Sequence, residues 1–224
     1  MKNKINLKGK KFVASFSGGK DSMLAIYRAI KEEMIPVEFI TTYNLDKERS
    51  WFHGIPENVL NSVSEAIGVP IRLIKTTGAE YEANFEKALQ EAKERGAQIC
   101  VFGDIDLEGH LEWCRDRCKA VGIGAFFPLW KESRKSLVYE FIDSGFTASI
   151  TVVDTNRMSD SFLGDVLTKA TTKEIEKCGA DICGENGEYH TFVHAGPLFK
   201  KQVQFTFGEK IHQDNYGILP ILSK

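Results

Sequence analysis

The sequence predicts an α/β fold with a parallel sheet, followed by a smaller α+β domain. Short apolar segments alternate with longer amphipathic segments up to about residue 128, as in parallel sheets that helices cover on both faces. A glycine-rich turn lies between the first apolar segment and the first amphipathic one. Beyond residue 128 this alternation changes, so we place a first domain at 1–128 and a second at 129–224.

The strands of the first domain follow from apolar segments that are too short for helices. Each segment has three to six residues and is bounded by polar or glycine-containing turns. Strands are therefore predicted at 12–16, 37–42, 71–74, 99–102 and 125–127.

The helices of the first domain follow from apolar residues that recur every three or four positions. Gly68 and Gly96 end two of these patterns, as glycine does at helix C-termini. Helices are predicted at 20–33, 58–67, 80–94 and 111–120.

The second domain has fewer regular signals. We expect a helix at 133–144, a strand at 146–153 and a long helix at 160–177. A turn-rich segment follows at 183–190, and residues 203–207 alternate as in an exposed strand.

The composition excludes several classes of protein. Of 224 residues, 42% are hydrophobic and 27% charged, which excludes disordered, collagen-like and disulfide-scaffold chains. The 29 basic and 31 acidic residues give a net charge of −2, which argues against a surface built to hold nucleic acid.

The chain is expected to be cytoplasmic. Its apolar runs have only a few residues, whereas a membrane-spanning helix needs about 20. No apolar segment follows the lysines near the start, so we expect no secretory signal; these are Lys2, Lys4, Lys8, Lys10 and Lys11. The five cysteines form no Cys-x-x-Cys pair, which indicates reduced and mostly buried thiols.

The turn at residues 17–22, Ser-Gly-Gly-Lys-Asp-Ser, is the clearest candidate site. The glycines permit positive φ and the close approach of a ligand. The first amides of the following helix have no partner within the helix, so an anion can accept hydrogen bonds from them. Lys20 adds charge, and Asp21 can hold a metal ion or position the turn. The alternative is an ordinary helix start capped by Asp and Ser.

These six residues match the signature of the PP-loop superfamily, also called N-type ATP pyrophosphatases. The resemblance implies an adenine nucleotide alpha hydrolase-like (HUP) domain at 1–128 that cleaves ATP to AMP and pyrophosphate with Mg²⁺. In such enzymes ATP adenylates an oxygen of the substrate, and a nitrogen or sulfur nucleophile displaces AMP.

A second polar cluster occupies residues 184–191, Gly-Glu-Asn-Gly-Glu-Tyr-His-Thr. Glu185 and Glu188 can act as a pair of carboxylates in acid–base chemistry or bind a cationic group. The alternative is a solvated turn, because Asn-Gly favours tight turns and exposed glutamates are common.

Several motifs together resemble the diphthine–ammonia ligase family over most of the chain, from about residue 11 to 199. They are the turn at 17–22, Ser50-Trp51-Phe52-His53, Gly103-Asp104-Ile105, Phe127-Pro128-Leu129-Trp130, Asp154, residues 184–191 and Gly196-Pro197-Leu198-Phe199. The resemblance implies adenylation of the diphthine carboxylate on a translation elongation factor, followed by attack of ammonia. Residues 106–114 depart from the Ser-x-Tyr-Gln-like stretch of diphthamide-making members, as in a divergent branch.

The expected site has three sets of residues. The catalytic set is Lys20, Asp21, Glu185, Glu188 and His190. The ATP-binding set is Ser15, Ser17, Gly18, Gly19, Lys20, Asp21, Ser22, Tyr43, Gly103 and Asp104. The substrate-binding set is His53, Glu112, Trp130, Glu185, Asn186, Glu188, Tyr189 and Thr191.

We expect no metal site among the cysteines and histidines. His110, Cys114 and Cys118 have i,i+4 spacing on one predicted helix, but zinc sites usually gather ligands from turns as well. His190 and His194 have the same spacing, but nearby glycine and proline argue against a helix there.

The leading functional hypothesis is an AMP-forming amide ligase that acts on a carboxylate acceptor with free ammonia. One alternative is a tRNA-modifying PP-loop enzyme, against which the missing Cys-x-x-Cys and the net charge count. The other is a non-catalytic protein that senses ATP or AMP. The sequence leaves a homodimer open.

Overall fold

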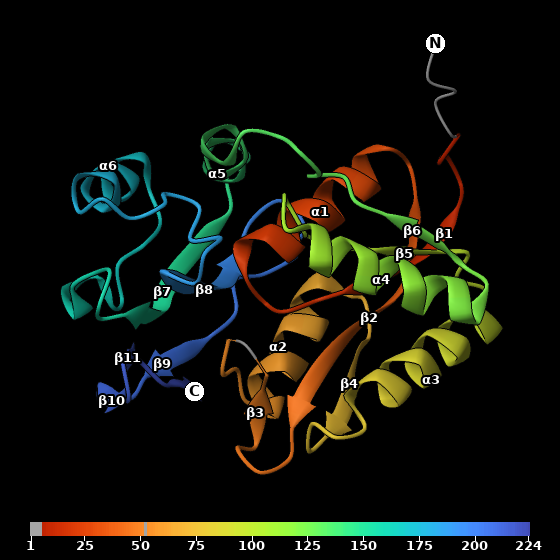
Figure 1. The fold of residues 1–224 in the computed structure, drawn as a ribbon, viewed down its shortest axis with the longest axis horizontal. Coiled ribbons are helices and arrows are strands. Elements are labelled where there is room, and N and C mark those ends of the chain that lie inside the picture. Colours follow the sequence, from red (N-terminus) through yellow and green to blue (C-terminus); the bar gives the residue numbers. More distant parts are fainter. Residues whose placement is uncertain (1–5, 52) are drawn as a thin grey trace.

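The computed structural model describes residues 6–51 and 53–224 and confirms the predicted fold class (Figure 1). Lys2, Lys4 and Phe52 lie outside the described residues. A central sheet with parallel strands forms one part of the molecule, and a second, smaller sheet lies beside it. The domain boundary at 128/129 stays a prediction.

Five parallel strands make up most of the central sheet, in the order β4-β2-β1-β5-β6. All five lie where the apolar segments predict them, which confirms the interpretation of those segments as buried strands. Their bounds are β1 Lys11–Ser15, β2 Ile35–Asn44, β4 Ile71–Thr76, β5 Ile99–Val101 and β6 Gly124–Phe126. The short antiparallel β3, Arg49–Ser50, pairs with the end of β2 and was not predicted.

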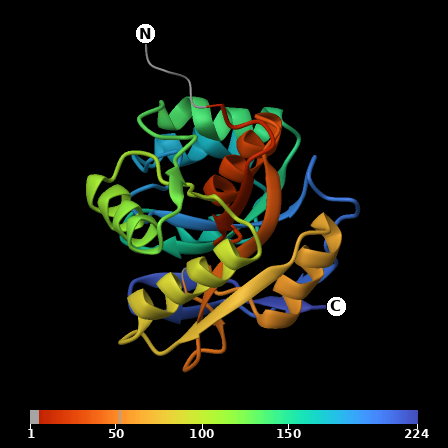
Figure 2. The same ribbon diagram turned by 90° about the vertical axis from the view of Figure 1, so that its right-hand side faces the viewer.

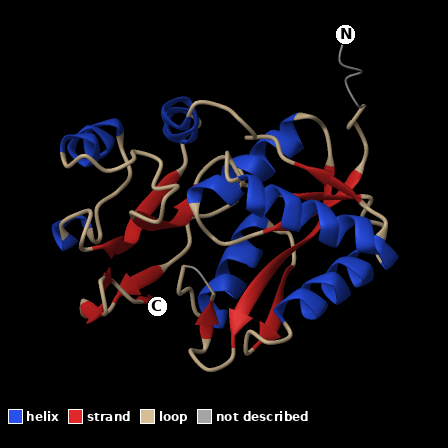
Figure 3. Ribbon diagram, viewed as in Figure 1, coloured by secondary structure: helices blue, strands red, loops and turns tan. Residues whose placement is uncertain are grey.

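Helices cover both faces of this sheet (Figure 3). Phe12 and Ala14 of β1 belong to a core that includes residues of α1 and α2, whereas Val13 between them belongs to a core with α3 and α4. This alternation is expected, because successive side chains of a strand point to opposite faces. The bounds are α1 Lys20–Lys31, α2 Glu57–Ile67, α3 Tyr81–Glu94 and α4 Glu108–Val121.

The second sheet is antiparallel, in the order β10-β11-β7-β8. Helices α5 and α6 accompany it, and the pair β9–β12 lies along α2, where the backbone amide of Lys200 also donates to the Ala66 carbonyl (Figure 2). The bounds are β7 Thr147–Asp154, β8 Tyr189–Ala195, β9 Phe205–Phe207, β10 Ile211–Gln213, β11 Tyr216–Ile218, β12 Ile221–Ser223, α5 Arg134–Asp143 and α6 Lys169–Lys177.

The predicted long helix at 160–177 is wrong. The structure has a 3₁₀ turn at Asp160–Phe162 and begins α6 only at Lys169. Gly164 has a φ of +93°, and the backbone around it bonds to β7 through the amides of Gly164 and Leu167. Thr168 then caps α6 with its hydroxyl. Pairing with an available strand edge therefore outweighed the helical spacing of the sequence.

Arg28, near the end of α1, ties this helix to the segment that leads into the second domain. Its guanidinium donates to the Pro128 carbonyl at 2.7 Å and to the carboxylates of Glu132 and Glu140. The same hydrophobic core also contains residues of α1 and of the second sheet. These ion pairs and the hydrogen bond to Pro128 thus hold the C-terminal end of α1 against the segment that follows β6.

None of the described helices is long and apolar enough to cross a membrane.

Replacing Gly103 by alanine tests the close contact between the end of β5 and the start of α1. A Cβ at Gly103 would lie 2.7 Å from the Ser22 nitrogen and 2.8 Å from the Asp21 carbonyl carbon. Because these are backbone atoms, we expect Gly103→Ala to lower the free energy of unfolding by about 1–3 kcal/mol, the usual cost of overpacking.

Urea denaturation measures this effect. The matched control is Gly109→Ala, because a Cβ at Gly109 would meet nothing within 4 Å. Equal stability of the two variants would contradict the prediction.

Candidate active site

A cavity of about 530 Å³ lies at the carboxyl edge of the central sheet, between the glycine turn and β8. The open edge of a parallel sheet is the usual ligand site in such folds. The structure brings most of the expected site residues to its lining: Ser15, Ser17, Lys20, Asp21, Ser22, His53, Gly103, Asp104, Glu185, Asn186, Tyr189, His190 and Thr191.

The turn at 17–22, called the glycine loop below, folds back on itself. The Ser17 amide donates to the Ser22 hydroxyl at 3.3 Å, and this hydroxyl donates to the Gly19 carbonyl at 3.0 Å. Gly18 has a φ of +88°, a conformation that glycine adopts without strain. Gly19 then precedes α1 with no side-chain cap. The helix start is therefore free of the serine or aspartate cap that the alternative interpretation requires.

Strand β8 of the second sheet holds the glycine loop in place. The Val193 amide donates to the Gly18 carbonyl at 3.0 Å. The Lys20 amide donates to the Thr191 hydroxyl at 3.1 Å, which satisfies one of the free amides at the start of α1. The loop is thus positioned by residues more than 170 positions away in the sequence.

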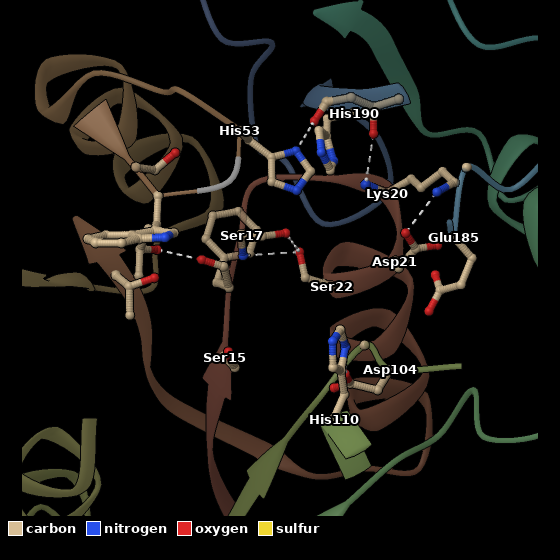
Figure 4. Close-up of a pocket in the computed structure, with 18 of the residues that line it drawn as sticks. Ser15, Ser17, Lys20, Asp21, Ser22, His53, Asp104, His110, Glu185 and His190 are labelled. Carbon is tan, nitrogen blue, oxygen red and sulfur yellow. Dashed lines mark hydrogen bonds and ion pairs between the residues drawn. The ribbon is translucent and has the colours of Figure 1, made fainter. Parts of the chain in front are cut away.

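Lys20 and Asp21 form a buried ion pair with Nζ to Oδ2 of 2.8 Å (Figure 4). Burial opposes the charge on Lys20, but the attraction of Asp21, together with Cys183 and Tyr189, outweighs burial and raises the pKa of Lys20 well above its ordinary value. The ammonium also lies 5.3 Å from the centre of the Tyr189 ring. Lys20 therefore stays charged, and Asp21 neutralises it until a ligand enters.

Glu185, from the 181–188 loop, lies beside this ion pair at the cavity (Figure 4). Burial, with the nearby negative Asp21, raises its pKa to about 7, while Lys20 and Arg134 oppose the shift. A carboxyl of this kind exchanges its proton near neutral pH, as a general acid or base must.

Arg134 joins the loop that follows β5 to the 181–188 loop, and the sequence analysis gave it no role. Its guanidinium binds both oxygens of Asp106 at 2.8 Å and Asp181 at 2.6 Å. The Asp181 carboxylate in turn accepts the amides of Cys183 and Glu185 at 3.1 Å. Arg134 thereby fixes the backbone segment that carries Glu185. The sequence could not predict this contact, because Arg134 and Asp181 are far apart in the chain.

Glu188 does not line the cavity, which corrects its predicted catalytic and substrate-binding role. The side chain is buried, and its oxygens accept the Asn186 backbone and side-chain amides at 3.0 and 3.1 Å. Arg157 lies 3.5 Å from the same carboxylate. Glu188 therefore closes the 181–188 loop from behind and leaves Glu185 as the carboxylate of this loop that faces the cavity.

Five further expected residues are absent from the cavity lining, among them Gly18 and Gly19 of the glycine loop. Tyr43 is buried next to the lining residue Thr42, and the Lys75 ammonium lies 5.7 Å from the centre of its ring. Glu112 is exposed, because α4 buries Leu111 and Cys114 on either side of it. Trp130 contacts Phe127 and Lys131 instead.

Aromatic residues form a wall of the cavity that the sequence analysis did not assign. Trp51 and Tyr81 line it with ring centres 5.7 Å apart, and the Tyr81 hydroxyl donates to Thr42 at 3.4 Å. Trp51 belongs to the motif at residues 50–53, so the sequence did give a reason to expect it at the site. No sequence motif contains Tyr81, which reaches the cavity only through the packing of α3.

The cysteines and His110 do not gather around a metal site. His110 is exposed and lies 3.5 Å from the carboxylate of Asp104, whereas Cys114 and Cys118 are buried. Burial raises the pKa of the Asp104 carboxyl, and the negative Asp21 contributes to the rise. Among the described residues, no group of three His, Cys, Asp or Glu side chains could hold a metal ion. All five thiols are free, and Cys178 alone is exposed.

The fold and the site define a mixed α/β protein with a glycine loop and a cavity at the carboxyl edge of its parallel sheet. Residues 10–125 match the diphthamide synthase N-terminal domain and residues 133–224 match the diphthamide synthase C-terminal domain. The chain belongs to this family, as the sequence motifs predicted.

Relatives named diphthine–ammonia ligase are similar over most of the chain. The Danio rerio protein is 25% identical over 93% of this chain and 91% of its own length, and the Mus musculus protein is 25% identical over 93% and 87%. The Homo sapiens protein is 36% identical over 46% and 40%.

A crystal structure of a predicted subunit of tRNA methyltransferase from Methanocaldococcus jannaschii is also similar. Its TM-score is 0.46 at 16% identity, covering 86% of this chain and 100% of that chain. A likeness at this level supports no conclusion about function.

Replacing Glu185 by glutamine tests its raised pKa through the pH dependence of stability. The unfolded carboxyl loses its proton at about pH 4.5, but the folded one keeps it up to about pH 7. The folded state binds more protons in this range, so wild-type stability falls as the pH rises through it. Glutamine removes that loss, and we expect Glu185→Gln to be stabilising by about 1 kcal/mol above pH 7, after allowance for solvent screening.

Thermal and urea unfolding from pH 4 to 8 measures the difference. Its control is Glu209→Gln, an exposed position away from the cavity. A difference between wild type and Glu185→Gln that does not change with pH would contradict the assignment.

Replacing Arg134 by methionine tests its role between the two loops. The change leaves the Asp106 and Asp181 carboxylates without their shared partner, and we expect a loss of about 1–2 kcal/mol in unfolding free energy. The neighbouring Lys135→Met is the matched control, because Lys135 is exposed and contacts only Glu176 and the Tyr139 ring, away from the two loops, among the described residues. Chemical denaturation of both variants decides whether the loss is specific to Arg134.

Proposed function

We propose that this protein is an ATP-dependent amide ligase that activates a carboxylate acceptor and joins it to ammonia. The observation that carries the proposal is that Lys20, Asp21 and Glu185 line one cavity, with Glu185 beside Asp21 (Figure 4). Lys20 and the glycine loop offer the cationic and amide groups that the phosphates of ATP need, and Glu185 offers a carboxyl that exchanges protons near pH 7. The family and the names of its relatives support the same reaction class.

The first half-reaction is adenylation. A carboxylate oxygen of the acceptor attacks the α-phosphorus of ATP, and the bond to the β-phosphate breaks. Charge builds on the departing pyrophosphate, where the glycine loop, the first amides of α1 and Lys20 stabilise it. These groups are held in place before the ligand arrives, so little reorganisation is needed as the reaction proceeds.

Asp21 and Asp104 fit the Mg²⁺ that accompanies ATP. Both line the cavity, and each carboxylate disfavours the charge of the other, which a divalent cation would relieve. Mg²⁺ is commonly bound by one or two carboxylates together with substrate phosphates and water. When bound, the ion would neutralise phosphate charge.

The second half-reaction forms the amide. Ammonia attacks the acyl carbon, the bond to the AMP oxygen breaks, and one proton must leave the new nitrogen. Glu185 in its ionised form accepts a proton from ammonium, which is the main form of ammonia at neutral pH. The other acceptor contacts would come from Asn186, Tyr189, His190 and Thr191. An acceptor such as diphthine on an elongation factor meets these requirements, and we place the reaction in the cytoplasm.

Analysis of the nucleotide products tests the proposal. We expect AMP and pyrophosphate, and no ADP, when the protein is mixed with ATP, Mg²⁺, ammonium and an elongation factor bearing diphthine. Lys20→Ala should lower AMP formation by about a hundredfold or more, because it removes a fixed cation from the phosphate site. Lys31→Ala, at the other end of α1, is the matched control.

The other outcomes separate the alternatives. If AMP forms with another acceptor but not with this factor, the result supports the AMP-forming ligase reaction and contradicts diphthine as the acceptor. Tight ATP binding without turnover supports the sensing protein. Loss of a thionucleoside from the tRNA of a deletion strain supports the tRNA-modifying enzyme. Formation of ADP contradicts the proposal itself.

A further inference from the structure

Two histidines from distant parts of the chain form one wall of the cavity over the glycine loop. The rings of His53 and His190 meet edge to face, with centres 4.9 Å apart (Figure 4). His53 lies directly over Gly19, because a Cβ at Gly19 would be 2.3 Å from the His53 Cε1 atom. A pyrophosphate group held by the glycine loop would therefore lie next to His53.

One hydrogen bond fixes which nitrogen of His53 carries the proton. Its Nδ1 lies 2.8 Å from the Thr191 carbonyl oxygen, which can only accept, so Nδ1 donates. In the neutral ring, Nε2 then has a lone pair and no proton. A lone pair at this position repels a phosphate oxygen, whereas a protonated Nε2 donates to it.

The surroundings keep both rings neutral before a ligand binds. The charged groups that face them are Lys20 and Asp21 of α1. Burial, with the two rings' mutual repulsion and the positive Lys20, lowers the pKa of His53 to about 3. Burial and Lys20 also lower the pKa of His190 to about 4, although Asp21 opposes the shift.

We propose that His53 takes up one proton on Nε2 when a polyphosphate binds over the glycine loop, so that ligand binding and protonation are coupled. The proposal deepens the proposed function and rests on its pyrophosphate-binding loop. Burial and Lys20 disfavour the protonated form of His53, whereas the negative charge of the bound ligand favours it. Because the two rings repel each other when charged, the site takes up one proton rather than two.

The proton has a defined path in the reaction. When the bond between the α-phosphorus and its bridging oxygen breaks, the proton on Nε2 passes to that oxygen of the departing pyrophosphate. His53 returns to its neutral form with its Nδ1 bond to Thr191 intact, and solvent supplies the next proton when the next ATP binds. His53 is therefore a catalytic acid and His190 its positioning partner.

Two substitutions of His53 separate protonation from simple contact. In His53→Asn, the side-chain amide takes the place of Nδ1 and can donate to Thr191, but nothing takes the place of Nε2. In His53→Gln, the side-chain amide takes the place of Nε2 as a donor that does not titrate. His212→Asn is the matched control, because His212 is exposed and pairs with Asp160 away from the cavity.

Calorimetric titration with Mg²⁺ and inorganic pyrophosphate, in buffers of different ionisation enthalpy, counts the protons taken up. At pH 6.5 we expect wild type and His212→Asn to take up about one proton more than His53→Asn, as linkage requires. Wild-type affinity should fall by up to about tenfold per pH unit relative to that of His53→Gln between the free-state and bound-state pKa values of His53, and should level off once the pH exceeds the bound-state value. Pyrophosphate itself also exchanges protons with pH, but this contribution is the same for wild type and variants and cancels in the difference between them.

Each result decides a separate point. Pyrophosphate binding with equal proton uptake in wild type, His53→Asn and His53→Gln overturns the inference and leaves the proposed ligase intact. Failure of the folded wild type to bind pyrophosphate or ATP overturns both. Circular dichroism and thermal unfolding establish that each variant is folded before it is titrated.

Discussion

The attachment of the glycine loop to β8 is the contact on which the rest of the site depends. A loop at the edge of a parallel sheet would ordinarily be positioned by its own sheet and helix. Here the Gly18 carbonyl and the Lys20 amide are bonded to Val193 and Thr191 of the second sheet. The same strand places His190 beside the loop, and the 181–188 loop leads directly into it. The groups proposed to bind phosphate and those proposed to face the acceptor are consequently bonded into one unit.

The charged and titratable groups of this unit have partners or surroundings within the protein that set their charge. Lys20 is paired with Asp21, Arg134 with Asp106 and Asp181, and the two histidines are neutral. Glu185 is only partly ionised at neutral pH, since burial raises its pKa to about 7. Adding a phosphate, a cation or a proton would change these ion pairs and the protonation of the histidines and Glu185. The site is therefore built to respond to charge that the substrates bring.

The sequence was most informative where local chemistry determines structure. The five parallel strands and the glycine loop were predicted because their signals lie within a few adjacent residues. The short strands β10, β11 and β12 were missed, and 160–177 was misinterpreted, because pairing with strands elsewhere in the chain decides their conformation. For the same reason the sequence could place Glu185 and Glu188 in one motif, but could not show that one faces the cavity and the other closes the loop. Arg134 and Tyr81 were out of reach because their partners are distant in sequence.

The internal bonding of the 181–188 loop has a consequence for how this protein family can diversify. Glu188 and Asp181 fix the loop backbone through their own short-range bonds, and Arg134 anchors it from one side. The Glu185 side chain lines the cavity and is not part of what holds the glycine loop. Under the proposed function, mutation could therefore alter acceptor preference by exchanging this side chain while nucleotide chemistry persists, which would give evolution a route to new substrates without rebuilding the catalytic core.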